Sequence, residues 1–293
     1  MNTPLHSRAL LRHIRFDEVF VLQGTPLMGA AFSIGTISPA NLEPLSVFLI
    51  GSILLVAHVF ALNDWADIAH GLKAPDPLVS SRRLFWFSLF LLIASLLVFA
   101  LISSRVVVLG AIVAALGFFY SHPKLNFKGT PIASSFPHLV GGLFHFLLGY
   151  AVFSPIDSRG ALIALFFALT FTAGHLNHEV RDFELDSKTN ARTNAVAFGK
   201  RPTFIAGLIV FTLAYLCLVL LTGFYLIFAP LIFWSAILFY VLHLFWSVRA
   251  LQAGLDPKVL DRFQIQYRAL YAVIGILMLL AAYGRATGPV LLQ

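Results

Sequence analysis

The sequence predicts an all-α integral membrane protein with about nine transmembrane helices. Its 293 residues are 59% hydrophobic and only 11% charged, with a mean hydropathy of +0.88, whereas soluble domains average about 25% charged residues. The apolar residues form long runs, and a helix needs about 20 mostly apolar residues to cross a bilayer. Basic residues are concentrated in alternate connections between these runs. Together these observations favour a chain that crosses the bilayer many times.

Nine stretches come close to the required length, and they cover residues 18–37, 45–63, 84–103, 106–121, 132–153, 160–178, 203–222, 225–247 and 268–286. The first contains Pro26 and three glycines, which membrane helices tolerate when neighbouring groups satisfy the backbone. The break between the seventh and eighth depends on Thr222 and Gly223 alone. We therefore expect a basic segment over 1–17, a single membrane domain over 18–286 and a short tail over 287–293.

The distribution of charge predicts the orientation of the chain. If the N-terminus lies in the cytoplasm, all Lys and Arg residues except Arg105, Arg159 and Arg285 fall in cytoplasmic segments. Such an excess of basic residues in cytoplasmic loops sets the orientation of membrane proteins. We therefore expect the N-terminus in the cytoplasm and the C-terminus outside, in a cytoplasmic (inner) membrane. The net charge of +7 reflects this topology, so we expect no nucleic acid partner.

Two clusters of acidic residues lie where predicted spans end. The first is Asn63-Asp64-Trp65-Ala66-Asp67, and the second runs from Glu179 to Asp186. Carboxylates are costly near a bilayer, so they indicate function there, and the whole chain has only 13 Asp and Glu residues. Spacings of three and four residues place these groups on one face of a helix. Both clusters fall on the predicted cytoplasmic side.

Carboxylates at this spacing, without cysteine ligands, suit a hard cation such as Mg²⁺, which is usually bound together with substrate phosphates. If both segments are helix ends, the carboxylates can converge on a cavity and hold Mg²⁺ against a diphosphate. The carboxylates with this spacing are Asp64, Asp67, Glu179, Asp182 and Asp186. Basic residues nearby could bind the remaining phosphate oxygens, namely Lys128, Arg181, Lys188 and Arg192. The sequence therefore predicts a membrane enzyme that acts on a lipid diphosphate.

Three motifs, in this order, resemble those of the UbiA family of intramembrane prenyltransferases. Asn63-Asp64-x-x-Asp67 is similar to the first aspartate motif of that family, and Arg181-Asp182-x-x-x-Asp186-x-Lys188 is similar to the second. Between them, Tyr120-Ser121-His122-Pro123 with Lys128 resembles the family's Tyr-Ser-x-Pro…Lys segment. The resemblance covers nearly the whole chain, over about residues 20–285.

The resemblance implies a bundle of nine helices around a central cavity that is open to lipid. It implies Mg²⁺-dependent transfer of a prenyl group from a polyprenyl diphosphate to an aromatic or other lipophilic acceptor, with membrane lipid as the surroundings. The catalytic and metal-binding residues would be Asp67, Asp182 and Asp186. The residues that bind the donor would be Asn63, Tyr120, Lys128, Arg181 and Lys188.

The chain departs from the family's pattern at three places, one of which is His178-Glu179, where Asn and Asp are common. Gly71 stands where the first motif usually carries another Asp, and Arg82-Arg83 replaces a later Arg-Pro pair. Asp64 or Asp76 would then supply the missing carboxylate, or the site would use fewer carboxylates. Two other functions remain open, a non-catalytic family member that binds isoprenoid lipid and a secondary transporter of organic anions. A transporter with inverted repeats would carry its clusters on opposite faces, so the enzyme is favoured.

Overall fold

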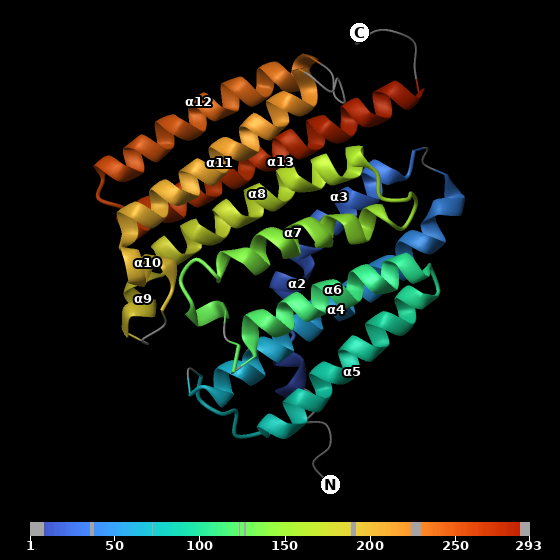
Figure 1. Cartoon of the computed structure of the whole chain (residues 1–293), viewed down its shortest axis with the longest axis vertical. Coiled ribbons are helices and arrows are strands. Elements are labelled where there is room, and N and C mark those ends of the chain that lie inside the picture. The colour runs from blue at the N-terminus through green and yellow to red at the C-terminus, as the bar shows by residue number, and fades with distance from the viewer. Residues whose placement is uncertain are drawn as a thin grey trace. The chain divides into compact units, whose positions relative to one another are not determined.

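The computed structural model describes residues 9–35, 38–71, 73–122, 124–125, 127–188, 192–223 and 230–287. All regular secondary structure in these ranges is helical (Figure 1), as predicted. The helices are α2 (Phe16–Leu22), α3 (Gly24–Ser33), η1 (Pro39–Asn41), α4 (Leu42–Ala69), α5 (Ser81–Ala100), α6 (Ser104–Ser121), η2 (Phe127–Gly129), α7 (Ser135–Tyr150), α8 (Ser158–Arg181), α9 (Phe183–Lys188), α10 (Asn194–Phe198), α11 (Lys200–Gly223), α12 (Pro230–Gln252) and α13 (Pro257–Thr287).

Among the described helices, seven are long and apolar enough to cross a membrane, namely α4 with η1, α5, α6, α8, α11, α12 and α13. The predicted spans 18–37 and 132–153 differ from this pattern. The first is divided into α2 and α3, because Pro26 has no N–H to donate to the carbonyl of Leu22 and so cannot continue the helix. The second is the shorter α7 of 16 residues, because Ile132, with a φ of 67°, turns the chain before the helix begins.

The chain divides into two compact units, and the chain passes between them at residues 128/129, at 143/144 inside α7, and at 155/156. The first unit comprises Met1–Lys128 and Phe144–Pro155, and the second comprises Gly129–Leu143 and Ile156–Gln293. Each unit contains one of the two acidic clusters, so each cluster is described within its own unit. The domain boundaries expected from the sequence, at 17/18 and 286/287, remain predictions.

In the first unit, α4 packs against both α5 and α6. The side chain of Phe99 is fully buried between these helices. A Cβ atom added to Gly51 of α4 would lie 2.5 Å from the Phe99 ring, and one added to Gly110 of α6 would lie 2.8 Å from it. Small residues at such places allow membrane helices to approach closely. This packing fixes the direction of α4, whose last turns carry the first acidic cluster.

In the second unit, α8 packs against α11, α11 against α12, and α13 against α8 and α12. Its core includes the rings of Phe204, Phe211, Phe263 and Tyr267, and the His243 ring is fully buried beside Phe211 at a centroid distance of 4.4 Å. This core fixes the direction of α8, which ends at the second acidic cluster.

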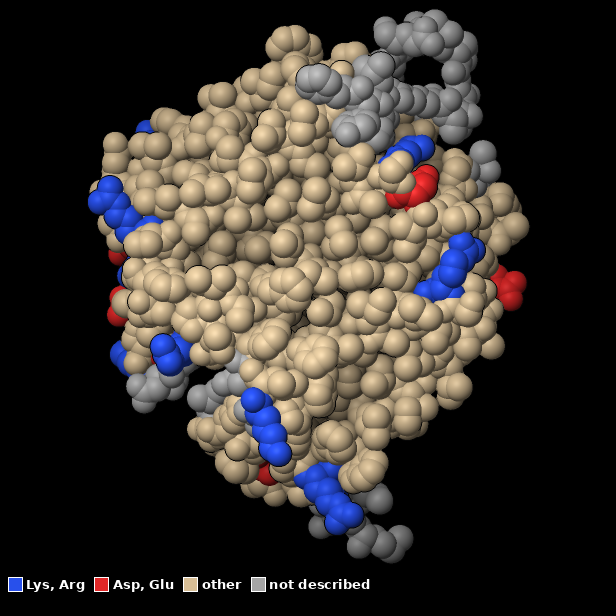
Figure 2. Space-filling view, viewed as in Figure 1, with Lys and Arg blue, Asp and Glu red and all other residues tan. Residues whose placement is uncertain are grey.

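Large apolar side chains remain exposed on the outer faces of the long helices, for example Leu97, Trp234 and Leu280. Most of the surface visible in Figure 2 carries no charged side chain. Apolar surface of this extent is unusual on a soluble monomer and is what a lipid-facing surface requires.

Candidate active site

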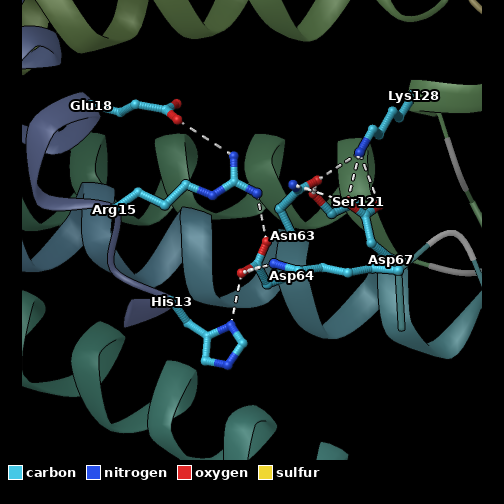
Figure 3. A network of polar contacts seen from close by, with 9 residues as sticks. His13, Arg15, Glu18, Asn63, Asp64, Asp67, Ser121 and Lys128 are labelled. Carbon is cyan, nitrogen blue, oxygen red and sulfur yellow. Dashed lines mark hydrogen bonds and ion pairs between the residues drawn. The ribbon is translucent and has the colours of Figure 1, made fainter. Parts of the chain in front are cut away.

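The first acidic cluster lies in the last two turns of α4. Asn63 and Asp67 are four residues apart and project from the same face of the helix, with 3.5 Å between Asn63 Nδ2 and Asp67 Oδ2. Lys128, from η2, places its Nζ 2.8 and 2.9 Å from the two carboxylate oxygens of Asp67 (Figure 3). Ser121 Oγ, at the end of α6, donates to Asn63 Oδ1 at 3.3 Å. The structure thus brings together three of the predicted site residues.

Three side-chain oxygens converge on the ammonium of Lys128, because Asn63 Oδ1 also lies 3.5 Å from Lys128 Nζ. Oxygen atoms are the ligands that Mg²⁺ takes, usually from one or two carboxylates completed by water and substrate phosphates. Within the described ranges, no group of three or more His, Cys, Asp and Glu side chains is placed to hold a metal ion. A Mg²⁺ site that is completed by phosphate oxygens of the substrate does not need three such side chains. The donor atoms of Asp67 and Asn63 therefore fit Mg²⁺.

Asp64 has a different set of partners and is buried, with 1% of its surface exposed. Its Oδ2 lies 2.8 Å from His13 Nδ1 and 2.7 Å from Lys73 Nζ, and its Oδ1 lies 2.6 Å from Arg15 Nη2. Arg15 has a φ of 54°, in the left-handed region that residues other than glycine rarely adopt. A buried carboxylate is tolerated when it is paired in this way. Asp64 therefore ties the segment before α2 and the segment after α4 to α4 itself.

Gly71 lies just beyond the end of α4, so the helix face that carries Asp67 does not extend to position 71. The helix ends at Ala69, and Gly71 has a φ of 70°, the left-handed conformation that glycine commonly adopts just after a helix. The backbone N–H of Lys73 then donates to the carbonyl of Asp67 at 3.2 Å. Position 71 therefore terminates the helix and does not continue its face.

Neither of the substitutes suggested for the missing carboxylate is seen to join Asp67. The Asp64 carboxylate is already paired with His13, Arg15 and Lys73. Asp76 accepts a hydrogen bond from the backbone N–H of Leu78 at 2.7 Å, and its Oδ2 lies 3.8 Å from His13 Nε2. Asp76 therefore lies next to His13, which is also a partner of Asp64.

The second cluster begins where α8 ends. Arg181 binds the carboxylate of Asp182 through two contacts, Nε to Oδ1 at 2.7 Å and Nη2 to Oδ2 at 3.0 Å. The same guanidinium donates from Nη1 to Gln264 Oε1 on α13 at 2.9 Å. The backbone N–H of Asp186 donates to the carbonyl of Asp182 at 2.9 Å, so the two aspartates lie one turn apart. Lys188 is exposed at the end of α9.

Glu179 is buried and serves a neighbouring loop. Its Oε2 accepts from the backbone N–H of Asn194 at 3.0 Å, and its Oε1 accepts from Ser134 Oγ at 3.4 Å. The Oε1 atom also lies 3.1 Å from His175 Nε2, and the His175 ring stacks on that of His138 at a centroid distance of 3.5 Å. Glu179 therefore joins the start of α10 and the turn before α7 to the end of α8.

Tyr120 lies in the last turn of α6, next to Ser121, and is half-buried. Sequence reasoning missed the partners that organise both clusters, namely His13, Arg15, Lys73, Ser134, Asn194 and Gln264. The basic N-terminal segment was the one visible signal for two of them. The others are single polar residues without a local pattern.

The fold and the clusters define a helical membrane protein in which carboxylates, amide oxygens and cations gather at helix ends. The sequence matches the UbiA prenyltransferase family over residues 24–268, so the chain belongs to this family, as predicted. No curated protein sequence matches the chain.

Solved structures show the same fold. A structure of digeranylgeranylglyceryl phosphate synthase in membranes is 15% identical, with a TM-score of 0.75, and the match covers 94% of this chain and 98% of that one. A UbiA homologue from Archaeoglobus fulgidus bound to DMAPP and Mg²⁺ is 17% identical, with a TM-score of 0.65 and coverage of 94% and 97%. The same homologue bound to GPP and Mg²⁺ is 18% identical, with a TM-score of 0.61 and coverage of 94% and 98%. These findings confirm the predicted fold class of an all-α integral membrane protein.

Proposed function

We propose that the protein transfers a prenyl group from a polyprenyl diphosphate to an aromatic or other lipophilic acceptor within the membrane, with Mg²⁺ as cofactor. The observation that carries this proposal is the convergence of both Asp67 oxygens and Asn63 Oδ1 on one cation, the Lys128 ammonium. Membership of the UbiA family supports it. The Archaeoglobus fulgidus homologue, which binds DMAPP or GPP together with Mg²⁺, supports the donor class and the metal.

In the first unit the proposed metal ligands are Asp67 and Asn63. In the second unit they are Asp182 and Asp186. When bound, Mg²⁺ would neutralise the diphosphate leaving group and favour cleavage of its bond to the prenyl carbon. Asp64 and Glu179 are left out of this set, because their carboxylates are buried in contacts that hold neighbouring segments.

The cationic side chains of Lys128 in the first unit and of Arg181 and Lys188 in the second would bind phosphate oxygens of the donor, and Tyr120 of the first unit would contribute to donor binding. Arginine suits this task because its planar guanidinium presents several donors at once. Cleavage of the donor leaves an allylic cation, which aromatic faces can stabilise and which an apolar enclosure protects from water. We assign no general base, because electron-rich acceptors can lose their proton after the new bond has formed.

The site would lie on the cytoplasmic side of the cytoplasmic (inner) membrane, with the N-terminus inside. The distribution of Lys and Arg supports this orientation, since only Arg105, Arg159 and Arg285 would fall outside. Both acidic clusters then belong to the same side, which disfavours a transporter built from inverted repeats.

The test is diphosphate release by the purified protein in detergent, with geranyl, farnesyl and geranylgeranyl diphosphate, a pool of aromatic and lipid acceptors, and either Mg²⁺ or EDTA. We expect release and a prenylated product with Mg²⁺ alone, and a loss of at least about 100-fold, or about 2.7 kcal/mol of barrier, in Asp67→Asn and Asp182→Asn. Glu184→Gln is the matched control, because Glu184 is 62% exposed and pairs with Lys200. Full activity of Asp67→Asn would refute the metal assignment. Donor binding without turnover would favour the non-catalytic isoprenoid-binding alternative.

A further inference from the structure

We propose that the Lys128 ammonium takes the place of the metal ion on Asp67 before the substrate binds. Its release from Asp67 then couples the binding of the metal ion to the binding of the prenyl diphosphate. The inference rests on the proposed function, because it concerns the order in which the two ligands of that site bind. It depends only on residues of the first unit.

The Lys128 ammonium occupies the oxygens that a metal ion would need. Its Nζ lies 2.8 and 2.9 Å from the Asp67 oxygens, the length of a charge-assisted hydrogen bond. The same lone pairs cannot hold an ammonium group and a metal ion at once. A metal ion on the remaining lone pairs of the carboxylate would lie beside the ammonium and be repelled by it, so metal binding to Asp67 competes with the Lys128 contact.

The two sides of this contact differ in exposure and in flexibility. The Lys128 side chain is 32% exposed and that of Asp67 is 15% exposed. Asn63 Oδ1 is held by Ser121 Oγ at 3.3 Å, whereas lysine carries its charge on a flexible four-carbon stem. The Asn63 oxygen is therefore held in place, and Lys128 is the more exposed and more flexible partner of the contact.

An ammonium that leaves Asp67 loses two charge-assisted hydrogen bonds unless another anion replaces the carboxylate. The diphosphate of the donor supplies such an anion, and it supplies phosphate oxygens to the metal as well. Donor binding therefore favours metal binding, and the coupling must be equal in the other direction. A metal ion alone would bind weakly, because it must displace Lys128 with no compensation.

The experiment is a titration with Mn²⁺, in which the free ion is measured by electron paramagnetic resonance, with and without geranyl thiolodiphosphate as an unreactive donor analogue. Chelation of Mn²⁺ by the analogue is subtracted from protein-free titrations. The variants are Lys128→Met, Lys124→Met and Asp67→Asn. Lys124 is the matched control, because it is an exposed lysine of the same connection and its loss changes the net charge equally.

We expect the analogue to tighten Mn²⁺ binding to the wild type by about tenfold or more, within the usual range of coupling between sites. In Lys128→Met, Mn²⁺ alone should bind about tenfold more tightly, and the analogue should tighten Mn²⁺ binding by a smaller factor than in the wild type, because only its direct contacts with the metal remain. Lys124→Met should behave as the wild type, and Asp67→Asn should lose the binding. Equal Mn²⁺ affinities of the wild type and Lys128→Met, or equal gains in both lysine variants, would overturn the proposal and leave the metal site standing. No Asp67-dependent Mn²⁺ binding under any condition would overturn the proposed function together with this proposal.

Discussion

Asp64 and Asp67 lie three residues apart near the end of α4, yet their carboxylates have different partners. Asp64 is buried among His13, Arg15 and Lys73, whereas Asp67 binds Lys128 alone among the cations of the described residues (Figure 3). The Asp64 carboxylate is buried and paired with three basic side chains, and the Asp67 carboxylate is paired with one partly exposed lysine on a flexible side chain. We therefore expect Asp64 to contribute to the stability of the protein and Asp67 to contribute to ligand binding.

Replacing Asp64 with Ala should destabilise the protein, because the substitution removes the common acceptor of three basic side chains. Breaking a buried ion pair typically costs about 3–5 kcal/mol. Arg15 and Lys73 are 33% and 42% exposed, so water can compensate in part, and we expect a loss of about 2–3 kcal/mol. Unfolding of the purified variant in detergent, followed by circular dichroism against denaturant, measures this loss.

Asp67→Ala is the matched comparison for Asp64→Ala. Its partner Lys128 remains hydrated when the carboxylate is lost, so we expect stability close to that of the wild type and no turnover. If Asp64→Ala instead kept full stability and lost turnover, Asp64 would be assigned as a metal ligand, as its place in the motif first indicated.

The sequence was sufficient to predict the features that depend on local pattern. Apolar runs located the long helices, and helical spacing placed Asn63 with Asp67 on one face. The partners of the buried carboxylates could not be predicted from the sequence, because His13 and Asp64 are 51 residues apart and Ser134 and Glu179 are 45 residues apart. Contacts of this kind arise from tertiary packing, which no local spacing encodes.

Backbone conformation accounts for two of the places where the helices differ in extent from the predicted spans. The span 18–37 was predicted as one helix from its hydropathy, although Pro26 interrupts the hydrogen bonding. The start of the span 132–153 was misplaced because hydropathy does not report the left-handed conformation of Ile132. Hydropathy measures the preference of a segment for lipid and is insensitive to such breaks.

Gly71→Asp should not restore a stronger metal site, although the family usually has an aspartate there. The residue at position 71 has a φ of 70°, and a left-handed conformation costs a residue with a Cβ about 1–2 kcal/mol. We expect a lower apparent melting temperature and no gain in turnover. Gly71→Asn is the control, because Asn tolerates this conformation best among such residues. A rise in Mg²⁺-dependent activity in Gly71→Asp alone would contradict the reading that this position only ends α4.

Glu179→Ala should loosen the start of α10 because it leaves the backbone N–H of Asn194 without its acceptor. A buried polar group without a partner costs about 1–3 kcal/mol. Hydrogen exchange over residues 192–198, followed by mass spectrometry, should become faster, while Glu179→Gln, which keeps an acceptor oxygen, should change less. Unchanged exchange in Glu179→Ala would show that the contact does not stabilise this segment, and Glu179 would again be a candidate metal ligand.

Arg181 and Gln264 should act as one unit in donor binding. Gln264 Oε1 accepts from Arg181 Nη1 at 2.9 Å while the other side of the guanidinium holds Asp182. Lysine cannot reproduce this fork of donors, so we expect Arg181→Lys to lower kcat/KM for the prenyl diphosphate about tenfold, or about 1.4 kcal/mol. Gln264→Ala should lower it less, because the guanidinium keeps its charge and its contact with Asp182.

A double-mutant cycle tests whether Gln264 works through Arg181. If it only orients the guanidinium, Gln264→Ala should have no further effect in the Arg181→Lys background, since residues in contact give strongly non-additive effects. Gln266→Ala, two residues further along α13, is the matched control and should leave kcat/KM unchanged in both backgrounds. Additive losses would instead mean that Gln264 affects the donor independently of Arg181. The kinetic parameters of the wild type and these five variants, measured at saturating acceptor and Mg²⁺, distinguish the outcomes. An orienting role predicts that Gln264→Ala changes KM for the donor only in the protein that keeps Arg181.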